Sequence, residues 1–157
     1  MKILIVTGEA SGDLHGAHLA KAIMTLDPTA QLVGIGGSGM RAAGVSLVPG
    51  VPQLDVMGLI GLSAIRAIFQ RVRAIRRVLK AEAWDLVVLI DNPGLNFHFA
   101  RVAKAAGRRV LYYIAPQVWA WRPGRMKWIQ RRVDHVVVIL PFEPELYRRA
   151  GVRCTFV

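Results

Sequence analysis

Five short runs of consecutive apolar residues, many of them β-branched, constrain the fold of this chain more than any other feature. Each run is apolar at successive positions and not at alternate ones, which is the pattern of a strand that is buried on both faces. Strands of this kind occur in parallel sheets that helices cover on both sides. We therefore expect parallel strands at Ile3–Val6, Gln31–Ile35, Leu86–Ile90, Val110–Ile114 and Val136–Leu140.

Segments with helical periodicity lie between these runs, at Asp13–Leu26, Ser63–Ala83, Phe97–Ala106 and Arg125–Arg132. The alternation of strand and helix predicts an α/β fold, a Rossmann-like parallel sheet flanked by helices. In such a sheet ligands bind beyond the carboxyl ends of the strands. The loops to inspect for a site are therefore 7–13, 91–96 and 115–125.

Length and charge narrow the classes of function. The 157 residues, 54% of them hydrophobic, suit one domain with a real core. With 21 Lys and Arg against 10 Asp and Glu, the formal charge of +11 favours an anionic partner. No apolar stretch approaches the roughly 20 residues of a membrane-spanning helix, so membrane contact is expected to be peripheral. A single cysteine, Cys154, cannot form an internal disulfide, which fits a reducing cytoplasm.

The first loop, Gly8-Glu9-Ala10-Ser11-Gly12-Asp13, follows a strand and precedes a helix. Glycines there allow backbone N–H groups to approach an anion or a sugar, and Ser11 or Asp13 has the chemistry of a helix cap. The spacing is not that of the dinucleotide-binding fingerprint. A tight strand-to-helix turn with a capping aspartate explains the same residues, and both interpretations stay open.

Asp91 places a carboxylate at the exit of the strand Leu86–Ile90. A carboxylate at that edge is a candidate general base for a hydroxyl nucleophile. The alternative is that Asp91 only starts the turn or caps the helix that follows.

The segment 112–122 combines the end of a strand, a proline turn and two tryptophans next to Arg122. Aromatic faces pack against sugar rings and acyl chains, and arginine binds phosphate. Single-strand nucleic-acid binders also mix aromatic and basic residues, but the chain has no RRM or OB pattern. Nucleic acid is therefore not an expected partner.

The helix predicted at Ser63–Ala83 has one apolar stripe and a cationic opposite side. A helix that packs on the core and exposes its charges to solvent is the common case. The alternative is a membrane-contacting helix whose arginines meet anionic headgroups. The four histidines do not form a metal site, because His15 and His18 have no third ligand nearby and His98 and His135 are isolated.

Together these motifs resemble the lipid-A-disaccharide synthases over essentially all 157 residues. The resemblance rests on segments that keep the order and approximate spacing of that family: Gly8–Asp13, Val56–Leu59, Asp91–Asn96, Pro116–Arg122 and Leu140–Glu143.

The resemblance implies the amino-terminal half of a B-type glycosyltransferase fold, in which two Rossmann-like domains face each other. The family joins UDP-2,3-diacylglucosamine to 2,3-diacylglucosamine 1-phosphate, with inversion, without a metal and without another cofactor, at the inner face of the cytoplasmic membrane. Asp91 matches the proposed general base. The resemblance implies substrate contacts from Glu9, Ser11, Gly12, Asp13, Met57, Asn96, Gln117, Trp119, Trp121 and Arg122, and acyl-chain or membrane contacts from Leu59, Ile60, Arg66, Phe69, Arg73 and Arg77.

Two positions depart from the family pattern. Gly94 stands where the family has a second aspartate after Asp91, and Gly61 stands where the family tends to have an acid. The family also continues past Val157 into a domain that binds the UDP-sugar. We expect residues 1–157 to be the acceptor-side domain and to be inactive alone, because the departing UDP needs contacts from the donor side. A standalone lipid-binding module and one half of a split glycosyltransferase are the alternatives.

Overall fold

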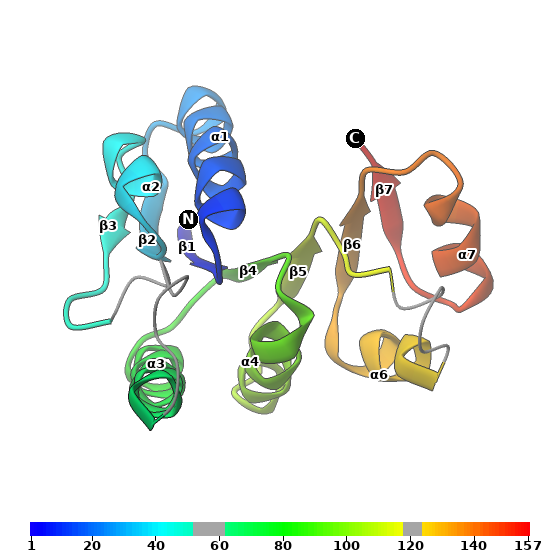
Figure 1. Cartoon of the computed structure of the whole chain (residues 1–157). Helices are drawn as coiled ribbons and strands as arrows, with labels where there is room; N and C mark the ends of the chain where they lie inside the picture. The colour runs from blue at the N-terminus through cyan, green and yellow to red at the C-terminus, as the bar shows by residue number, and fades with distance from the viewer. Residues whose placement is uncertain (52–61, 118–123) are drawn as a thin grey trace.

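A computed structural model describes residues 1–51, 62–117 and 124–157 (Figure 1). Seven strands form one sheet in which every pair is parallel, in the order β3-β2-β1-β4-β5-β6-β7. The predicted parallel sheet is thus confirmed. The strands are β1 (Lys2–Thr7), β2 (Gln31–Ile35), β3 (Ser46–Leu47), β4 (Leu86–Ile90), β5 (Val110–Tyr113), β6 (His135–Val138) and β7 (Cys154–Phe156).

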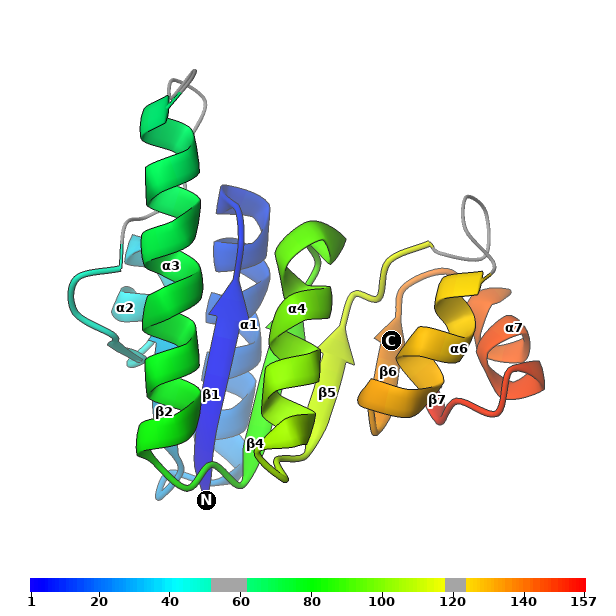
Figure 2. The same cartoon turned by 90° about the horizontal axis from the view of Figure 1, so that it is seen from below.

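Helices cover both faces of the sheet. Helices α1 and α2 lie on one face, and α3, α4 and α6 lie on the other, as Figures 1 and 2 show. None of the described helices is both long enough and apolar enough to cross a membrane. The helices are α1 (Ala10–Leu26), α2 (Ser38–Ala42), α3 (Leu62–Ala81), α4 (Pro93–Ala105), α6 (Gly124–Arg132) and α7 (Glu143–Arg149).

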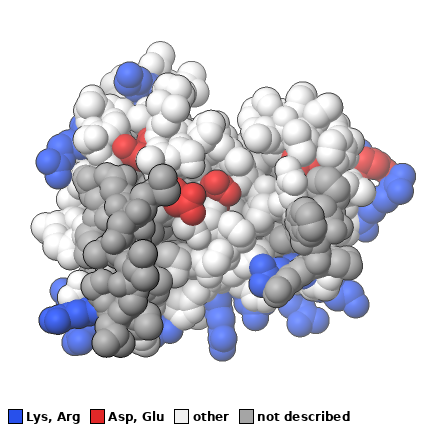
Figure 3. Space-filling model, in the orientation of Figure 1, with Lys and Arg blue, Asp and Glu red and all other residues white. Residues whose placement is uncertain are grey.

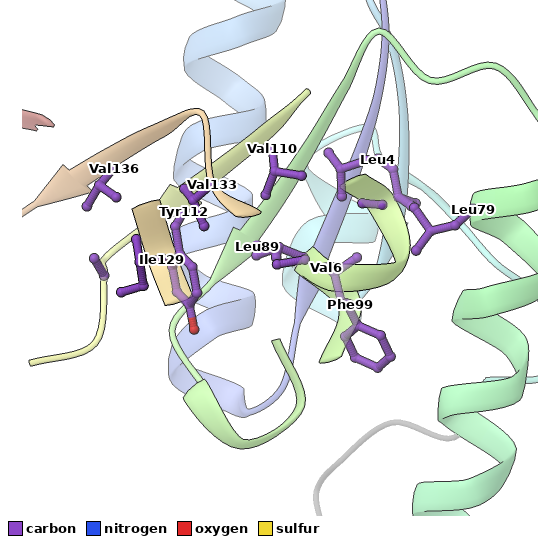
Figure 4. Close-up of a cluster of buried hydrophobic side chains, with 14 of the residues drawn as sticks. Leu4, Val6, Leu79, Leu89, Phe99, Val110, Tyr112, Ile129, Val133 and Val136 are labelled. Carbon is purple, nitrogen blue, oxygen red and sulfur yellow. The ribbon is translucent and has the colours of Figure 1, made fainter. Parts of the chain in front are cut away.

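The central strands divide the core into two clusters because successive side chains of a strand point to opposite faces. On β1, Leu4 and Val6 belong to the cluster under α3, α4 and α6, whereas Ile3 and Ile5 belong to the cluster under α1 and α2. Figure 4 shows the first cluster, in which Phe99 lies near Val6. Burial on both sides explains why the strands contain runs of consecutive apolar residues.

The ends of some elements differ from the sequence-based expectation. Helix α4 begins at Pro93 and not near Phe97, because the Asn92 side chain accepts a hydrogen bond from Leu95 N at 3.4 Å and proline suits the first helical turn. Four short elements had no prediction of their own as helix or strand: β3, α2, α7 and β7. They are too short to show a period.

The interpretation of Ser11 or Asp13 as the cap of the first helix is wrong. Glu9 occupies the N-cap position of α1, and no side chain there makes a capping hydrogen bond. The Asp13 carboxylate instead receives backbone N–H bonds from the start of α2, at 2.7 Å from Gly37, 2.8 Å from Gly39 and 3.1 Å from Met40. Asp13 therefore joins α1 to the loop after β2.

This arrangement predicts the effect of removing the Asp13 carboxylate. We expect Asp13→Ala to lower the free energy of unfolding by about 1–3 kcal/mol, because three partly buried N–H groups lose their acceptor. Asp13→Asn keeps one acceptor oxygen and should lie between. Urea unfolding at constant m-value measures the effect. The control is Ser11→Ala, an exposed neighbour; an equal loss in this variant would contradict the capping role.

Candidate functional site

The strand order reverses between β1 and β4, whose carboxyl ends lie side by side in the middle of the sheet. In a doubly wound sheet this reversal opens a crevice in which ligands bind. Figure 3 shows the molecule from this end, with acidic side chains near the centre and Lys and Arg mainly around the margin. The loops after β1 and β4 are therefore the first place to look for a site.

Those two loops touch directly. A Cβ atom on Gly8 would lie only 2.1 Å from Asn92 Nδ2 and 2.7 Å from Asn92 Cβ. Because the contact involves the root of the Asn92 side chain, it cannot be relieved by moving a flexible tip. Glycine at position 8 is what lets the loop after β4 pack against the loop after β1.

The backbone of Asp91 is strained and is held by several hydrogen bonds. Its φ is 48° and that of Asn92 is 38°, a region that non-glycine residues adopt at some cost. The Asp91 carbonyl accepts from Asn96 Nδ2 at 2.6 Å and from the Tyr112 hydroxyl at 2.8 Å. The Asp91 N–H donates to the Tyr113 carbonyl at 3.2 Å. Neighbouring strand β5 and helix α4 thus fix this residue from both sides.

Asn96 and Tyr112 are suited to holding this loop. Asn96 is 1% exposed and also donates to the Ile90 carbonyl at 2.9 Å. Burial raises the pKa of the Tyr112 phenol, so that its O–H stays protonated and remains a donor. The side chain of Asn96, expected from the resemblance to contact substrate, lies under the loop and positions Asp91.

The carboxylate of Asp91 is not used to hold the loop. Asn92, and not Asp91, is the N-cap of α4, so the capping alternative for Asp91 is wrong. The side chain is half-buried, and within residues 1–51, 62–117 and 124–157 it makes no hydrogen bond or ion pair. The fold therefore holds the backbone tightly and leaves the acid group available.

Residues with a strained backbone conformation lie at this edge of the sheet. Among the described residues, those other than glycine with positive φ are Asp91, Asn92 and Ile114, whose φ is 57°. Ile114 directly follows β5, the neighbour of β4, and positive φ is unusual for a β-branched residue. Such strain concentrates at functional sites because the surrounding structure has to impose it. Its position at the exits of β4 and β5 supports the location of the site.

The other predicted residues of the first loop occupy different positions. Glu9 and Ser11 are exposed at the start of α1. Gly12 is buried, and a Cβ there would lie 3.2 Å from Thr7 Cβ, which is a packing reason for glycine. Asp13 turns its carboxylate to α2. The described part of this loop therefore offers Glu9 and Ser11 to a ligand, and uses Gly12 and Asp13 for packing and capping.

Arg71 is a site residue that the sequence analysis missed. It is 2% exposed, and its guanidinium donates to the carbonyl of Thr7 at the end of β1. Burial lowers its pKa to about 10. The sequence spacing indicates that Arg71 is buried, because it lies four residues before Ile75 and eight before Leu79, on the face of α3 that packs on the core. A cation on an apolar stripe indicates a specific role.

Several predicted positions lie outside the described residues: Met57, Leu59, Ile60, Gly61, Trp119, Trp121 and Arg122. Gln117, just before the second gap, is exposed, and the carbonyl of Pro116 accepts from the Tyr147 hydroxyl at 2.9 Å. Within the described segments no three His, Cys, Asp or Glu side chains gather as a metal-binding group.

The fold and this edge define a class: a Rossmann-like α/β domain with an available carboxylate directly after a central strand, at the switch point. Comparison with known proteins specifies the family. The family model described as lipid-A-disaccharide synthetase matches residues 3–157. The chain belongs to this family.

Curated relatives agree with the family match. The lipid-A-disaccharide synthase of Geobacter metallireducens is 48% identical over 157 residues, which are 99% of this chain and 41% of the relative. That of Coxiella burnetii is 46% identical over 156 residues, 99% of this chain and 42% of the relative. The chain thus spans about two fifths of the length of these relatives. Among solved structures, a NAD binding oxidoreductase from Klebsiella pneumoniae matches 100% of this chain and 34% of the oxidoreductase chain. The sequence identity is 16% and the TM-score is 0.47, so this likeness does not bear on function.

The structure has space for a side chain at Gly94, one of the two positions that depart from the family pattern. Gly94 is exposed in the first turn of α4, and a Cβ there would meet only Asn92 Oδ1, at an ordinary 3.6 Å. The fold therefore has room for the aspartate that the family pattern places here. An acid in the first turn would also suit the positive end of the helix.

The two glycines predict opposite responses to an added methyl group. Gly8→Ala should lower the free energy of unfolding by about 1–3 kcal/mol, because its Cβ overlaps Asn92. Gly94→Ala should be neutral or raise it by up to about 1 kcal/mol, because alanine favours the helix and meets no close contact. Thermal and urea unfolding of both variants measures the difference. Equal stabilities would mean that the Gly8–Asn92 contact does not hold the loops together.

Proposed function

We propose that residues 1–157 supply the acceptor side of a glycosyltransferase that makes a lipid A disaccharide. In this reaction the 6-hydroxyl of 2,3-diacylglucosamine 1-phosphate attacks the anomeric carbon of UDP-2,3-diacylglucosamine. The new bond forms with inversion as the bond to UDP breaks. Family membership supports the reaction, and the position of Asp91 at the switch point supports its assignment as the base.

The single observation that carries the proposal is that the backbone of Asp91 is fixed while its carboxylate is left available. Its carbonyl is fixed by Asn96 and Tyr112, while its carboxylate makes no hydrogen bond or ion pair inside the described part of the chain. A general base must be positioned within reach of the proton it removes. Here the backbone provides the positioning and the acid group is free to accept the hydroxyl proton. Glu9 and Ser11, exposed on the adjoining loop, are the proposed contacts to the acceptor sugar.

We further propose that the contacts to the UDP-sugar come from residues outside 1–157. Stabilising the departing UDP requires hydrogen-bond donors and cations at its phosphates in the transition state. The switch-point edge presents acidic side chains at its centre (Figure 3), which suits a hydroxyl nucleophile better than a diphosphate leaving group. The 157 residues alone are therefore expected to bind acceptor without turnover.

The role of Asp91 predicts a large loss of rate on substitution. In an assay of UDP release that combines this chain with the carboxyl-terminal part of a full-length relative, Asp91→Asn should lower kcat by about 10²–10⁴-fold. Asparagine keeps the shape and tolerates the left-handed backbone, so folding should be unchanged. Glu82→Gln, which removes an exposed carboxylate near the amino end of β4, is the matched control. UDP release by Asp91→Asn within about threefold of the unchanged chain would exclude the general-base role.

We also propose that α3 meets the surface of an anionic membrane. Phe69 is 70% exposed, and Arg66, Arg73 and Arg77 are exposed beside it. The spacing of three and four residues places all four on one side of the helix. An exposed aromatic ring among arginines suits the interface between headgroups and acyl chains. An acylated acceptor would be drawn from such a surface, which favours a peripheral location at the inner face of the cytoplasmic membrane.

Vesicle sedimentation tests the membrane proposal. Wild-type chain should sediment with vesicles of phosphatidylcholine and phosphatidylglycerol, less so at high salt, and weakly with phosphatidylcholine alone. Phe69→Ser combined with Arg73→Gln should reduce the sedimented fraction several-fold, whereas Lys21→Gln on the opposite face of the sheet should not. Sedimentation that ignores both salt and these changes would contradict the proposal. Vesicle binding without acceptor-dependent UDP release in the combined assay would instead favour the standalone lipid-binding module.

A further inference from the structure

Three of the helices on one face of the sheet, α3, α4 and α6, contain no acidic residue. The sequences of α3, α4 and α6 include many Lys and Arg but neither Asp nor Glu. Figure 3, in the orientation of Figure 1, shows blue side chains along the lower margin, where Figure 1 places these helices. A solvated helical face usually mixes both signs of charge. An absence of acids from these three helices indicates an anionic ligand or surface.

Within this face the described residues form a groove between α3 and α4. It encloses about 630 Å³, with Leu79 and Val102 among its apolar lining residues. Its polar lining consists of Arg76, Lys80, His98, Arg101 and Arg108, and no carboxylate takes part. The groove is lined by α3 and by the part of α4 from His98 onward, and it extends to Arg108 beyond the end of α4, whereas Asp91 precedes the amino end of that helix. It is therefore separate from the switch-point site.

The cations of the groove differ from those just outside it. Lys104 pairs with Asp134 at 2.7 Å, and Lys2 pairs with Glu82. Arg76, Lys80, Arg101 and Arg108 make no ion pair with any residue that the structure describes. The positive charge of the groove is thus left uncompensated by the protein, although acidic residues are used a short distance away.

Two of these arginines are held in place. Arg76 Nε donates to His98 Nε2 at 3.0 Å, and Arg108 donates through one terminal nitrogen to the Glu82 carbonyl at 3.1 Å. Burial, followed by the charges of Arg76 and Arg101, lowers the pKa of His98, so that the ring is neutral and can accept. The buried Nε of Arg108 has no acceptor among the described residues. Ordered arginines without a carboxylate partner are suited to bind an oxyanion with fork geometry.

A different explanation is that these cations only offset the negative ends of two helix dipoles. That effect acts within the last turn, and Lys80 alone accounts for it on α3. Arg76 lies more than a turn before the end of α3, and Arg108 lies beyond the end of α4. The dipoles also do not explain a concave arrangement around a groove. A ligand explains the position, the concavity and the missing acids together.

We propose that the groove lined by Arg76, Lys80, Arg101 and Arg108 binds a phosphate group, carried either by a lipid headgroup or by a small soluble phosphate ester. The phosphate oxygens would accept from the guanidinium groups, while the apolar lining would contact the first carbons of the ester. The proposal does not depend on the role of Asp91, because the groove shares no lining residue with the loops at the switch point.

An NMR titration of the ¹⁵N-labelled chain with inorganic phosphate, at constant ionic strength set with chloride, tests the site. Amide shifts should concentrate around residues 76–80 and 101–108. Arg76→Gln combined with Arg101→Gln should weaken phosphate binding at least about tenfold, because two charge-assisted contacts are lost. Lys21→Gln combined with Arg131→Gln removes the same charge from other exposed positions and should leave binding within about twofold.

Two further experiments identify the molecule that carries the phosphate. If glycerol 3-phosphate gives the same shifts and the groove variant leaves vesicle sedimentation unchanged, the ligand is a soluble ester. If the groove variant reduces sedimentation with vesicles of phosphatidylcholine and phosphatidic acid, the ligand is a headgroup. Shifts spread evenly over α3, α4 and α6, or equal weakening in the control pair, would overturn the proposal. Should the double variant fail to fold, the single change Arg101→Glu at an exposed position carries the same test.

Discussion

Burial of β1 and β4 on both faces is the constraint on which the rest of the structure depends. Because the side chains of each strand alternate between two apolar clusters, neither face of the central pair can be left to solvent. Helices must therefore cover both sides, and a parallel sheet needs those helices as crossovers. The carboxyl ends of the two strands meet at the reversal of strand order. Hydrophobic burial thus fixes the place where polar residues converge.

At that edge the backbone after β4 is locally strained, and the strained conformation fixes the position of the loop. Two successive residues, Asp91 and Asn92, adopt positive φ, and Ile114 does so on the adjoining strand. The hydrogen bonds from Asn96 and Tyr112, with the close contact between Gly8 and Asn92, offset this strain. Each of these supports comes from a different element, so the geometry of the loop depends on the whole sheet. A carboxylate held in this way needs no hydrogen bond of its own to stay in position.

The sequence was sufficient to predict the sheet and its parallel sense, because buried strands and amphipathic helices leave strong periodic patterns. It was not sufficient for contacts between loops. The acceptor role of Asp13 toward α2 depends on where the loop after β2 falls in space, which periodicity does not record. Arg71 could have been found, because a charge on an apolar stripe needs a partner, but the partner is a backbone carbonyl on another element. Gly8 could be recognised as part of a tight loop, but not as the contact for Asn92.

The distribution of charge has a geometric consequence for how the molecule would rest on an anionic surface. The face covered by α3, α4 and α6 is cationic, and the strands run roughly parallel to that face (Figure 2). Electrostatic attraction would turn this face toward the surface before contact. The switch-point edge would then open sideways, along the plane of the surface and not away from it. A substrate anchored in that plane could reach Asp91 by lateral diffusion, without leaving the surface layer.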